Sequence, residues 1–485
     1  MIGAGMSGLA MAVRLKQSGV AFTVLEKNAD VGGTWFENTY PGCRVDSPNH
    51  SYSYSFEANH DWPLYYSTQD VLLGYFKRVS ERRELRSHIR FGTEVEEAVW
   101  DEAAGLWRVR VRTADGASET LLANALISAV GQLNRPKFPD IPGRERFAGE
   151  AFHSARWNHD YDLQGKRVAV IGTGASAFQF VPEIAGRVRE LLLFQRTAPW
   201  VMPTPNYTDP VPEGMKWLLQ HVPNYERWYR FWLFWLSADG LRPYVTADAD
   251  WQGSPRAIGA NNDMLRKMLI GYMRMQIGDK PELLAASIPD YPPGGKRMLR
   301  DNVRLISQPI TAIEEHSLRT QDGVTHEVDA IIYGTGFAAS DFLEPLRVVG
   351  RDGRALSEHW DGDARAYLGM TIPSFPNLFV MYGPNTNIVV NGSIIFFSEC
   401  ATHYIAGCLE LLLRSGQRSL EVKREPHDSF NHRVDAENTR MAWGAPQVSS
   451  WYKNKKGRVS QNWPFPLIDY WSATRAPDPD DYELR

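Results

Sequence analysis

The chain has 485 residues, of which 43% are hydrophobic and 23% charged, an ordinary balance for a folded protein of about three domains. Lysine and arginine number 53 against 57 aspartates and glutamates, so neither a nucleic-acid-binding surface nor a polybasic membrane patch is predicted. The three cysteines, Cys43, Cys400 and Cys408, form no CxxC or metal-ligand pattern. Their spacing disfavours a disulfide framework, a dithiol reductase and a metal enzyme, and it indicates a reducing compartment. We therefore expect a cytoplasmic protein.

Targeting and membrane segments are not predicted. The most apolar stretch, residues 388–413, is interrupted by Asn391, Glu399 and His403 and falls short of the roughly 18 uninterrupted apolar residues of a membrane span. The chain opens on a glycine-rich turn rather than on a basic segment, which disfavours a secretory signal. Because Met1-Ile2 leaves almost no strand before that turn, we expect the sequence to begin inside a longer chain.

The first motif is a dinucleotide-binding turn. GxGxxG occurs at Gly3, Gly5 and Gly8, a helical pattern follows, and an apolar run (residues 21–25) ends at Glu26. Glycines permit the tight turn and a close backbone approach, and the helix N-terminus then faces a pyrophosphate. Glu26 is placed to accept hydrogen bonds from a ribose diol. A lone GxGxxG is often an ordinary turn, so the strand–turn–helix–strand context carries the prediction.

A second turn of the same kind follows the apolar strand at residues 166–170. The next strand, residues 190–194, ends at Arg196 and Thr197, and no acidic residue stands there. A carboxylate would repel a 2′-phosphate, whereas an arginine would bind it. This second site is therefore predicted to bind NADPH. The residues expected to contact it around the turn are Gly172, Thr173, Gly174, Ala175, Ser176, Ala177 and Gln179.

The order of the elements indicates an α/β fold with two interleaved Rossmann-like dinucleotide-binding domains. Strands are predicted at residues 94–100, 106–113, 119–130 and 328–333, and another ends near Tyr382. The tail after Ala476 is expected to be a loose end. The predicted domains are FAD-binding (1–135 and 342–485), NADP-binding (136–203 and 292–341) and an aromatic helical insertion within the latter (204–291).

Motifs between and after the turns resemble those of the flavin-dependent Baeyer–Villiger monooxygenases. Their fingerprint FxGxxxHxxxW is matched at Phe147, Gly149, His153 and Trp157, followed by Asn158 where proline or aspartate is usual. The longer family motif is matched by Gly32-Gly-Thr-Trp35, Tyr40-Pro-Gly42 and Asp46. Lys296-Arg-Met-Leu and the tryptophan-rich insertion are most similar to the aryl-ketone branch typified by 4-hydroxyacetophenone monooxygenase.

The resemblance implies a reaction in which FAD, NADPH and O₂ convert a ketone to an ester or lactone through a C4a-peroxyflavin, with sulfoxidation as a possible side activity. The family's active-site arginine matches Arg297, whose permanent charge would stabilise the anionic oxygen adduct. Asp46 would hydrogen-bond Arg297 beside the flavin. Lys296, together with Arg196 and Thr197, would bind the 2′-phosphate, and Trp451 would reach the nicotinamide cofactor. From the residues alone, the commoner interpretation is a surface arginine for Arg297 and an ordinary turn aspartate for Asp46; the resemblance favours the functional roles.

Further roles follow from the same resemblance. Gly383-Pro-Asn385 is expected to open a helix whose N-terminus faces the flavin pyrimidine. His153 and Trp157 are expected to lie between domains and to couple domain motion to cofactor binding without touching substrate. The residues implied in FAD binding are Gly3, Gly5, Gly8, Glu26, Gly33, Thr34, Trp35, Asp46, Tyr52, Val95, Gly383 and Asn385.

One departure from the family and two rival functions remain. After Asn302 the chain passes directly to a strand, where relatives hold about a dozen more residues in a loop that covers cofactors, so either the loop is short or residues are missing. An N- or S-hydroxylating flavin monooxygenase would share both turns without requiring Arg297 and Asp46. A non-catalytic flavoprotein sensor or binding module would need no NADPH site, and Arg196 and Lys296 disfavour it.

Overall fold

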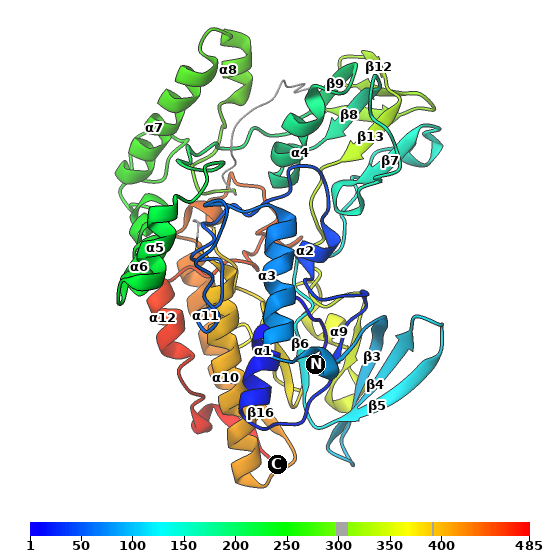
Figure 1. Ribbon diagram of the computed structural model, residues 1–485, viewed down its shortest axis with the longest axis vertical. Helices are drawn as coiled ribbons and strands as arrows, with labels where there is room; N and C mark the ends of the chain where they lie inside the picture. Colours follow the sequence, from blue (N-terminus) through cyan, green and yellow to red (C-terminus); the bar gives the residue numbers. More distant parts are fainter. Residues whose placement is uncertain (297–308, 390–391) are drawn as a thin grey trace.

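The computed structural model describes residues 1–296, 309–389 and 392–485, which form two stacked α/β units and a flanking group of helices (Figure 1). The lower unit in this view contains the N- and C-termini, and the upper unit contains the second parallel sheet. The chain crosses between the units more than once, because strands of the lower unit both precede and follow those of the upper one. Two interleaved Rossmann-like units are therefore present.

The start of the chain is the central strand of the lower unit's parallel sheet. Ile2 bridges Leu25 on one side and Ser128 on the other, so even two residues before the glycine turn suffice to enter the sheet. The order is β2–β1–Ile2–β6–β15, and helix α1 (Met6–Gln17) follows Ile2 directly. The named strands of this sheet are β1 (Val24–Leu25), β2 (Ile89–Arg90), β6 (Leu126–Ser128) and β15 (Leu378–Val380).

The upper unit has a four-stranded parallel sheet in the order β7–β13–β8–β9. Helix α4 (Ala175–Ala185) joins β8 to β9, so the second predicted turn lies at the carboxyl edge of a buried sheet. A small antiparallel sheet, β10–β11–β12, belongs to the same segment. The strands are β7 (Glu150–His153), β8 (Arg167–Ile171), β9 (Glu190–Phe194), β10 (Ile310–Ile313), β11 (Ser317–Thr320), β12 (Thr325–Glu327) and β13 (Ala330–Tyr333).

The single strand predicted at residues 119–130 is wrong, because two strands of different sheets occupy it. β5 (Ser118–Ala123) closes a twisted sheet of order β14–β3–β4–β5 and exposes much of its length, whereas β6 is fully buried. The chain changes sheets at Asn124, whose carbonyl accepts a 2.8 Å hydrogen bond from the Asn377 side chain. The other strands of this sheet are β3 (Thr93–Asp101), β4 (Leu106–Thr113) and β14 (Arg347–Val349).

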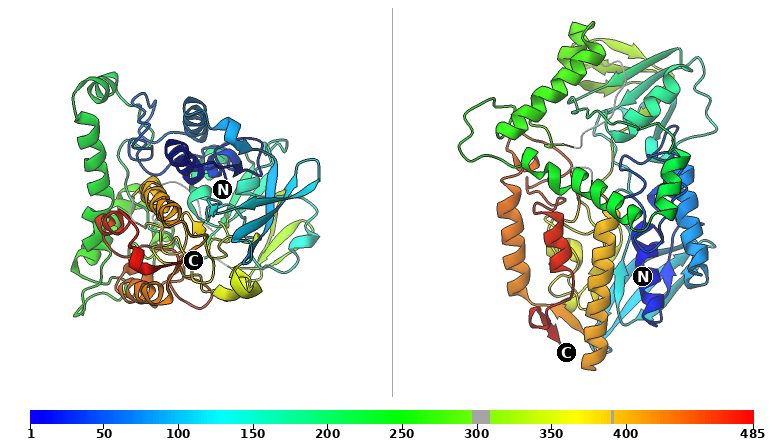
Figure 2. Two further views of the ribbon diagram at one scale, coloured as in Figure 1. Left: turned by 90° about the horizontal axis from the view of Figure 1, so that it is seen from below. Right: turned by 60° about the vertical axis from the view of Figure 1, so that its left-hand side comes forward.

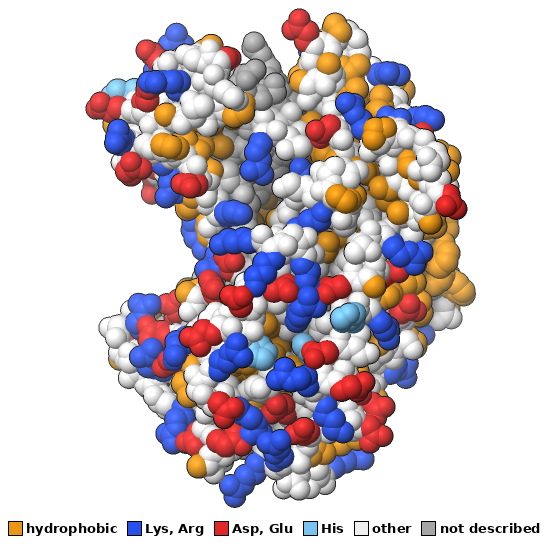
Figure 3. Space-filling view, turned by 180° about the vertical axis from the view of Figure 1, so that it is seen from behind, with side chains coloured by type: hydrophobic (Ala, Val, Ile, Leu, Met, Phe, Trp, Pro, Cys, Tyr) orange, Lys and Arg blue, Asp and Glu red, His pale blue; other side chains and the backbone are white. Residues whose placement is uncertain are grey.

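The helices of the insertion lie on one side of the two units (Figure 2). The helical insertion carries many exposed apolar side chains on its outer surface (Figure 3). Its helices are α5 (Glu213–His221), α6 (Tyr225–Ser237), η4 (Asp239–Tyr244), α7 (Ala260–Ile277) and α8 (Pro281–Ser287). The other α-helices are α2 (Thr34–Glu37), α3 (Gln69–Arg82), α9 (Leu356–Trp360), α10 (Ile394–Ser415), α11 (Arg424–Asn438) and α12 (Leu467–Ala473).

By length and composition alone, helix α10 could cross a membrane. Its most apolar 18-residue window has a mean hydropathy of 1.2. In the fold it packs against α1 and α12, and 56% of that window is buried. Its buried side chains belong to the core that also contains Phe379 and Phe430. We therefore interpret α10 as a core helix.

The prediction of a loose C-terminal tail is wrong. The last residues form β17 (Tyr482–Leu484), which pairs with β16 (Leu420–Val422). The ring of Tyr482 is buried, and its hydroxyl lies 2.8 Å from that of Tyr404 and 3.3 Å from Thr371 Oγ1. The many aspartates and prolines of the tail are typical of a loose segment, but this single aromatic anchor fixes it to α10.

Replacing the anchor should therefore loosen the whole lower unit. We expect Tyr482→Ala to lower stability by about 3–5 kcal/mol, since it removes a large buried ring, and Tyr482→Phe by about 1 kcal/mol, since it removes only the hydroxyl. Thermal melting followed by tryptophan fluorescence measures both, with Glu483→Ala, a change at the half-buried neighbouring residue, as the control. Equal melting temperatures for all four proteins would show that the tail is not anchored.

Candidate active site

The first glycine turn leaves no room for side chains. A Cβ atom on Gly3, at φ +95°, would lie 2.7 Å from the carbonyl oxygen of Ala129, and one on Gly8 would lie 2.0 Å from that of Gly3. Gly5 caps α1 without a side-chain hydrogen bond, and the first turn of that helix contains no acidic residue. The backbone N–H groups at this end are thus available to a pyrophosphate.

Glu26 lies at the end of β1, directly beneath the turn. Its carboxylate accepts hydrogen bonds from the backbone N–H groups of Ala4 (2.6 Å) and Asn28 (2.9 Å). Burial raises the pKa of Glu26, and the two backbone bonds oppose that effect. Because each carboxylate oxygen can accept more than one hydrogen bond, the geometry is compatible with a ribose diol at this carboxylate.

The loop after β1 brings several predicted flavin contacts together. Gly33, at φ +54°, caps α2, and a Cβ on it would lie 3.0 Å from the Cα of Gly5. Thr34 begins the helix, and the indole N–H of Trp35 donates to the hydroxyl of Tyr52 at 3.3 Å. The two rings meet edge to face, 5.9 Å apart. Trp35, Tyr52 and the glycine turn therefore form one continuous wall.

Two predicted contacts lie farther into the protein. Val95 is buried in the core that also contains Leu25, which places it behind the strand that ends at Glu26. Asp46 is half-buried, and the neighbouring Ser47 donates a 3.1 Å hydrogen bond to the carbonyl of Gly392.

The expected helix at Gly383-Pro-Asn385 is wrong, because α10 begins at Ile394 with Ser393 as its N-cap. Asn385 instead adopts φ +57° and donates from its side chain to the carbonyls of Val459 and Asn462. Its side-chain oxygen accepts from Arg458. These bonds satisfy the turn without a helix, so Asn385 fixes a loop.

The sequence analysis missed Gln132, which lies beside that loop. Its amide N–H₂ donates to the carbonyls of Tyr382 (2.7 Å) and Gly383 (3.2 Å). Its side-chain oxygen is buried and has no hydrogen-bond partner among the residues described, which suits a ligand N–H donor. Its place just after the carboxyl end of the parallel strand β6 is the signal that could have revealed it.

The second turn, like the first, leaves no room for a side chain at its first glycine. A Cβ on Gly172, at φ +103°, would lie 2.5 Å from the carbonyl oxygen of Gly334, and one on Gly334 would lie 3.2 Å from the Cβ of Ala177. Only a small residue such as Ala177 permits this helix-to-strand packing. Gly174 caps α4 without a side-chain bond, and no acidic residue stands in the first turn. Thr173, Ala175 and Ser176 line this opening, each of them half-buried.

Two cationic residues predicted to bind the 2′-phosphate lie close enough for their charges to interact, although a hundred positions separate them in the chain. Arg196 is exposed just beyond β9, and Lys296 is half-buried with its ammonium 4.6 Å from the ring centroid of Tyr291. Burial lowers the pKa of Lys296, and the nearby charge of Arg196 lowers it further. Thr197 is half-buried beside Arg196. Such mutual repulsion would be relieved by a bound dianion.

The fingerprint residues are explained by packing. The ring of Phe147 lies over Gly149, where a Cβ would come within 2.7 Å of it. His153 ends β7, and its Nδ1 accepts the N–H of Ala155. Nε2 therefore carries the ring proton and donates to the carbonyl of Gly336 at 3.0 Å. Gly336 follows β13, the strand that pairs with β7, so this bond lies within the upper unit and holds the chain where it leaves β13.

Comparisons with known proteins agree with this geometry. Residues 1–212 match the family model described as flavin-binding monooxygenase-like. A Baeyer–Villiger monooxygenase of Streptomyces coelicolor is 38% identical over all of this chain and 92% of its own length, and one of Pseudomonas aeruginosa is 37% identical over all of this chain and 90% of its own. The chain belongs to the Baeyer–Villiger monooxygenase family.

Solved structures give the same result. The closed form of cyclohexanone monooxygenase has a TM-score of 0.85 at 26% identity, and an oxidized steroid monooxygenase bound to NADP has a TM-score of 0.81 at 28% identity. Each match covers 100% of this chain and 98% of the chain in the solved structure. The family resemblance predicted from the motifs is thus confirmed.

In this Baeyer–Villiger monooxygenase the two units meet at Gln179 on α4. Its side-chain oxygen accepts from the hydroxyl of Tyr40 (2.9 Å), and its N–H₂ donates to the carbonyl of Arg44 (2.9 Å) and to the hydroxyl of Tyr207 (3.1 Å). A Cβ on Gly42 would lie 2.6 Å from the carbonyl oxygen of Gln179. The family motif Tyr-Pro-Gly is therefore a contact between the units.

An aromatic row runs beside the same contact. Trp157 packs on Phe152 and Phe180, each 5.2 Å away between ring centroids, and Phe180 in turn meets Tyr40 at 6.1 Å. Trp157 is thus connected to Tyr40 of the lower unit through Phe180.

Other predicted residues lie apart or outside. Trp451 is half-buried and packs on Tyr452, with ring centroids 4.6 Å apart. Arg297 and Asn302 lie outside the residues that the structure describes.

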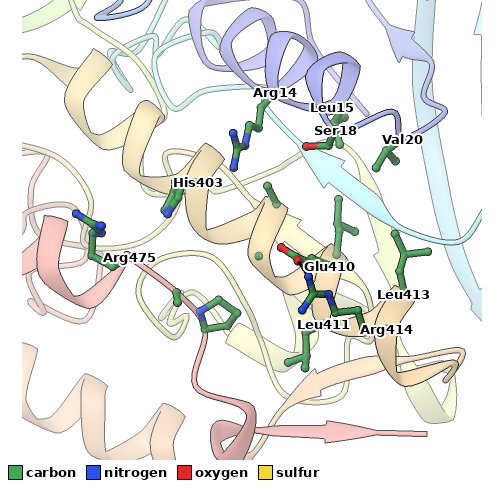
Figure 4. Close-up of a pocket in the computed structure, with 15 residues that line it drawn as sticks. Arg14, Leu15, Ser18, Val20, His403, Glu410, Leu411, Leu413, Arg414 and Arg475 are labelled. Atoms are coloured by element: carbon green, nitrogen blue, oxygen red, sulfur yellow. Dashed lines mark ion pairs between the residues drawn. The ribbon is translucent and has the colours of Figure 1, made fainter.

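A separate cavity of about 550 Å³ opens at the far end of α1 (Figure 4). Arg14 extends from α1 toward His403 of α10, and Arg414 pairs with Glu410 at 2.5 Å. The twelve residues of α1 put this cavity roughly 18 Å from the glycine turn. None of its lining residues is a predicted cofactor contact, so it is not the active site.

The buried state of His153 has a measurable consequence. Burial lowers the pKa of His153 from 6.5 to about 4. At a pH between these values, His153 is protonated in the unfolded chain but neutral in the folded chain. Stability should therefore fall as the pH drops from about 6.5 toward 4. The variant His153→Gln keeps a donor for Gly336. We expect its melting temperature to fall less than that of the parent between pH 7 and pH 5.

His50, which is buried, and His359, which is half-buried, also have a pKa lowered to about 4, but they are present in both proteins and cancel in the difference. The exposed change His432→Gln serves as the control and should track the parent. A constant gap in melting temperature between parent and His153→Gln across this range would contradict the assignment.

Proposed function

We propose that this chain uses FAD, NADPH and O₂ to convert aryl or cyclic ketones to esters or lactones. The enzyme is a flavin-dependent Baeyer–Villiger monooxygenase acting on a small molecule. Residues 1–135 and 342–485 bind FAD, residues 136–203 and 292–341 bind NADPH, and residues 204–291 are the insertion. The observation that carries the proposal is the pair of uncapped helix N-termini behind glycine turns, the second of which lies at the same sheet edge as Arg196. The reducing cytoplasm suits its three free thiols.

The residues around the first turn fit FAD. The N-terminus of α1 binds the pyrophosphate, Glu26 the ribose diol, and the wall of Gly33, Thr34, Trp35 and Tyr52 the flavin side. The side-chain oxygen of Gln132, which has no hydrogen-bond partner among the described residues, can accept a hydrogen bond from the imide N–H of the flavin ring. Bound FAD, once reduced by NADPH, supplies the activation of O₂.

Arg297 supplies the fixed positive charge that stabilises the oxyanion on the way to the ester, and Asp46 orients it. Support comes from the family motif and from the segment that leads to it. Asn262 on α7 donates to the carbonyls of Tyr244 (2.7 Å) and Pro293 (3.0 Å). A Cβ on Gly294 would lie 2.5 Å from Val245. The insertion therefore holds the chain four residues before Arg297.

The aryl or cyclic preference rests on the resemblance to the aryl-ketone branch and on the aromatic lining where the insertion meets the C-terminal segment. Trp443 donates to the side chain of Asn438 at 2.7 Å, and Tyr291 and Tyr452 are buried nearby in adjoining clusters. Flat apolar substrates suit such surroundings. Sulfides are expected as secondary substrates, whereas amines would indicate a hydroxylating flavin monooxygenase.

The first test is product analysis. The purified enzyme, given NADPH, ¹⁸O₂ and a panel of acetophenones, cyclic ketones, a sulfide and an amine, should yield esters or lactones that contain one ¹⁸O atom. Arg297→Ala should retain FAD and slow reduction by NADPH but form ester roughly 100-fold more slowly or not at all. Arg300→Ala, another change in the same short segment, is the matched control. Ester formation at the parent rate would remove Arg297 from the chemistry, and oxidation of the amine alone would favour the hydroxylating alternative.

A second test addresses the nicotinamide cofactor. Arg196→Ala should raise KM for NADPH about 10- to 100-fold, since a charge-assisted bond is lost, with little change in kcat and none in the weak use of NADH. Arg189→Ala is the control, because Arg189 precedes β9 at the opposite end from Arg196. An unchanged KM for NADPH would refute the 2′-phosphate role.

A further inference from the structure

Helix α6 presents a row of large apolar side chains to solvent. Trp228, Phe231, Trp232, Trp235 and Leu236 follow helical spacing and form one outer face, which we call the α6 stripe; its four aromatic members expose between 50% and 69% of their surface. Not one of the helix's thirteen residues is buried. Figure 3 shows hydrophobic side chains gathered along the rim that contains α5 and α6. Helix α5, which packs on α6, adds the exposed Trp217.

The inner face of α6 is firmly held, so the stripe is a fixed surface. Arg230 donates to the carbonyl of His50 (2.6 Å) and to the hydroxyl and carbonyl of Ser53 (2.8 and 3.0 Å). Phe234 packs on Phe396 of α10 with ring centroids 5.3 Å apart. A helix ordered in this way loses little conformational entropy when its outer face binds.

The size of the surface matches half of a dimer interface. With about 150–250 Å² for each whole aromatic side chain, the stripe and Trp217 expose on the order of 600 Å² of apolar area. A typical monomer has no larger patch than about 300–600 Å², while each partner in a stable complex contributes roughly 800 Å². The stripe supplies the apolar centre of such an interface, and its polar surroundings supply the rim.

The charges around the stripe favour a protein over an anionic lipid surface. Glu226 and Arg230 pair with each other at 3.6 Å, and Lys216 on α5 pairs with both Asp61 and Glu213. Arg227 is the one charged residue on the exposed side of α6. Interfacial membrane helices carry a strongly charged face rich in lysine and arginine, whereas α6 has only Glu226, Arg227 and Arg230, two of them paired with each other.

We propose that the α6 stripe is a self-association surface, on which a second copy of this chain packs its own α6 antiparallel about a two-fold axis near Trp232. Around that centre, Trp228 of one copy meets Leu236 of the other. Arg227 then lies against the last residue of the partner's α6, where the helix dipole favours a cation. One patch meeting itself in this way is the isologous contact expected of a closed dimer.

The first experiment is sedimentation of the FAD-loaded enzyme at micromolar concentration. One chain weighs 55.0 kDa, so the parent should sediment as a species of roughly twice that mass. Trp228→Glu combined with Trp232→Glu should give the monomer with unchanged flavin content and melting temperature. Leu122→Glu, which alters an equally exposed side chain on β5, should remain dimeric. A parent that is monomeric would overturn the proposal.

Cross-linking tests the geometry itself. Cys43, Cys400 and Cys408 are all buried, so Trp232→Cys introduces an accessible thiol at the expected axis. Two such thiols should form a disulfide across the interface under mild oxidation, because that bond requires Cα atoms within about 7 Å. Leu122→Cys should not. A dimer that survives the double glutamate change, or that Trp232→Cys fails to link, would place the interface elsewhere and overturn the proposal.

Membrane binding is the competing outcome. Vesicles of zwitterionic lipid and vesicles containing anionic lipid are mixed with the parent enzyme and pelleted. Retention of the enzyme in the supernatant is expected. Pelleting of a monomeric parent, abolished by the double glutamate change, would show that the stripe enters a bilayer and would contradict self-association.

Discussion

Steric exclusion at a few glycines determines the shape of the dinucleotide turn in each half of this enzyme. At Gly3, Gly8 and Gly172 a single added carbon would lie 2.0–2.7 Å from a backbone carbonyl oxygen of an adjoining turn or strand. Such distances cannot be relieved by rotating a side chain, so the turns accept only glycine. Each of these turns also directs a helix N-terminus, which has no side-chain cap, away from its sheet. The cofactor geometry therefore follows from backbone packing more than from any charged side chain.

The same constraint operates between the units. At Gly42 a Cβ would come within 2.6 Å of the carbonyl of Gln179, and around this contact the Gln179 amide bonds to Tyr40, Arg44 and Tyr207. Polar bonds of this kind contribute about 1 kcal/mol each, so they position the units without locking them. The aromatic row of Trp157, Phe180 and Tyr40 adds apolar packing beside these polar bonds.

The fold class, both turns and the family were predictable because each depends on local patterns: glycine spacing, apolar runs and the residue that ends the next strand. Arg196 and Lys296 were predicted separately, and the fold brings their charges together. The errors arose where distant contacts decide local structure. Asn385 is held by Val459 and Asn462, and the C-terminal tail by the burial of Tyr482. Gln132 was missed because an unsatisfied buried oxygen is visible only once its surroundings are known.

The helical insertion connects the catalytic segment with the outside of the molecule. On one side Asn262 fixes Pro293, and on the other Arg230 fixes the backbone of His50 and Ser53, the neighbours of Tyr52. The insertion thus supports both walls of the proposed flavin and substrate site, and one of its helices, α6, carries the exposed stripe. Because Arg230 already fixes the inner face of α6, a partner can pack on the outer face without displacing the loop that carries Tyr52. Association and the cofactor sites therefore use opposite faces of one ordered helix.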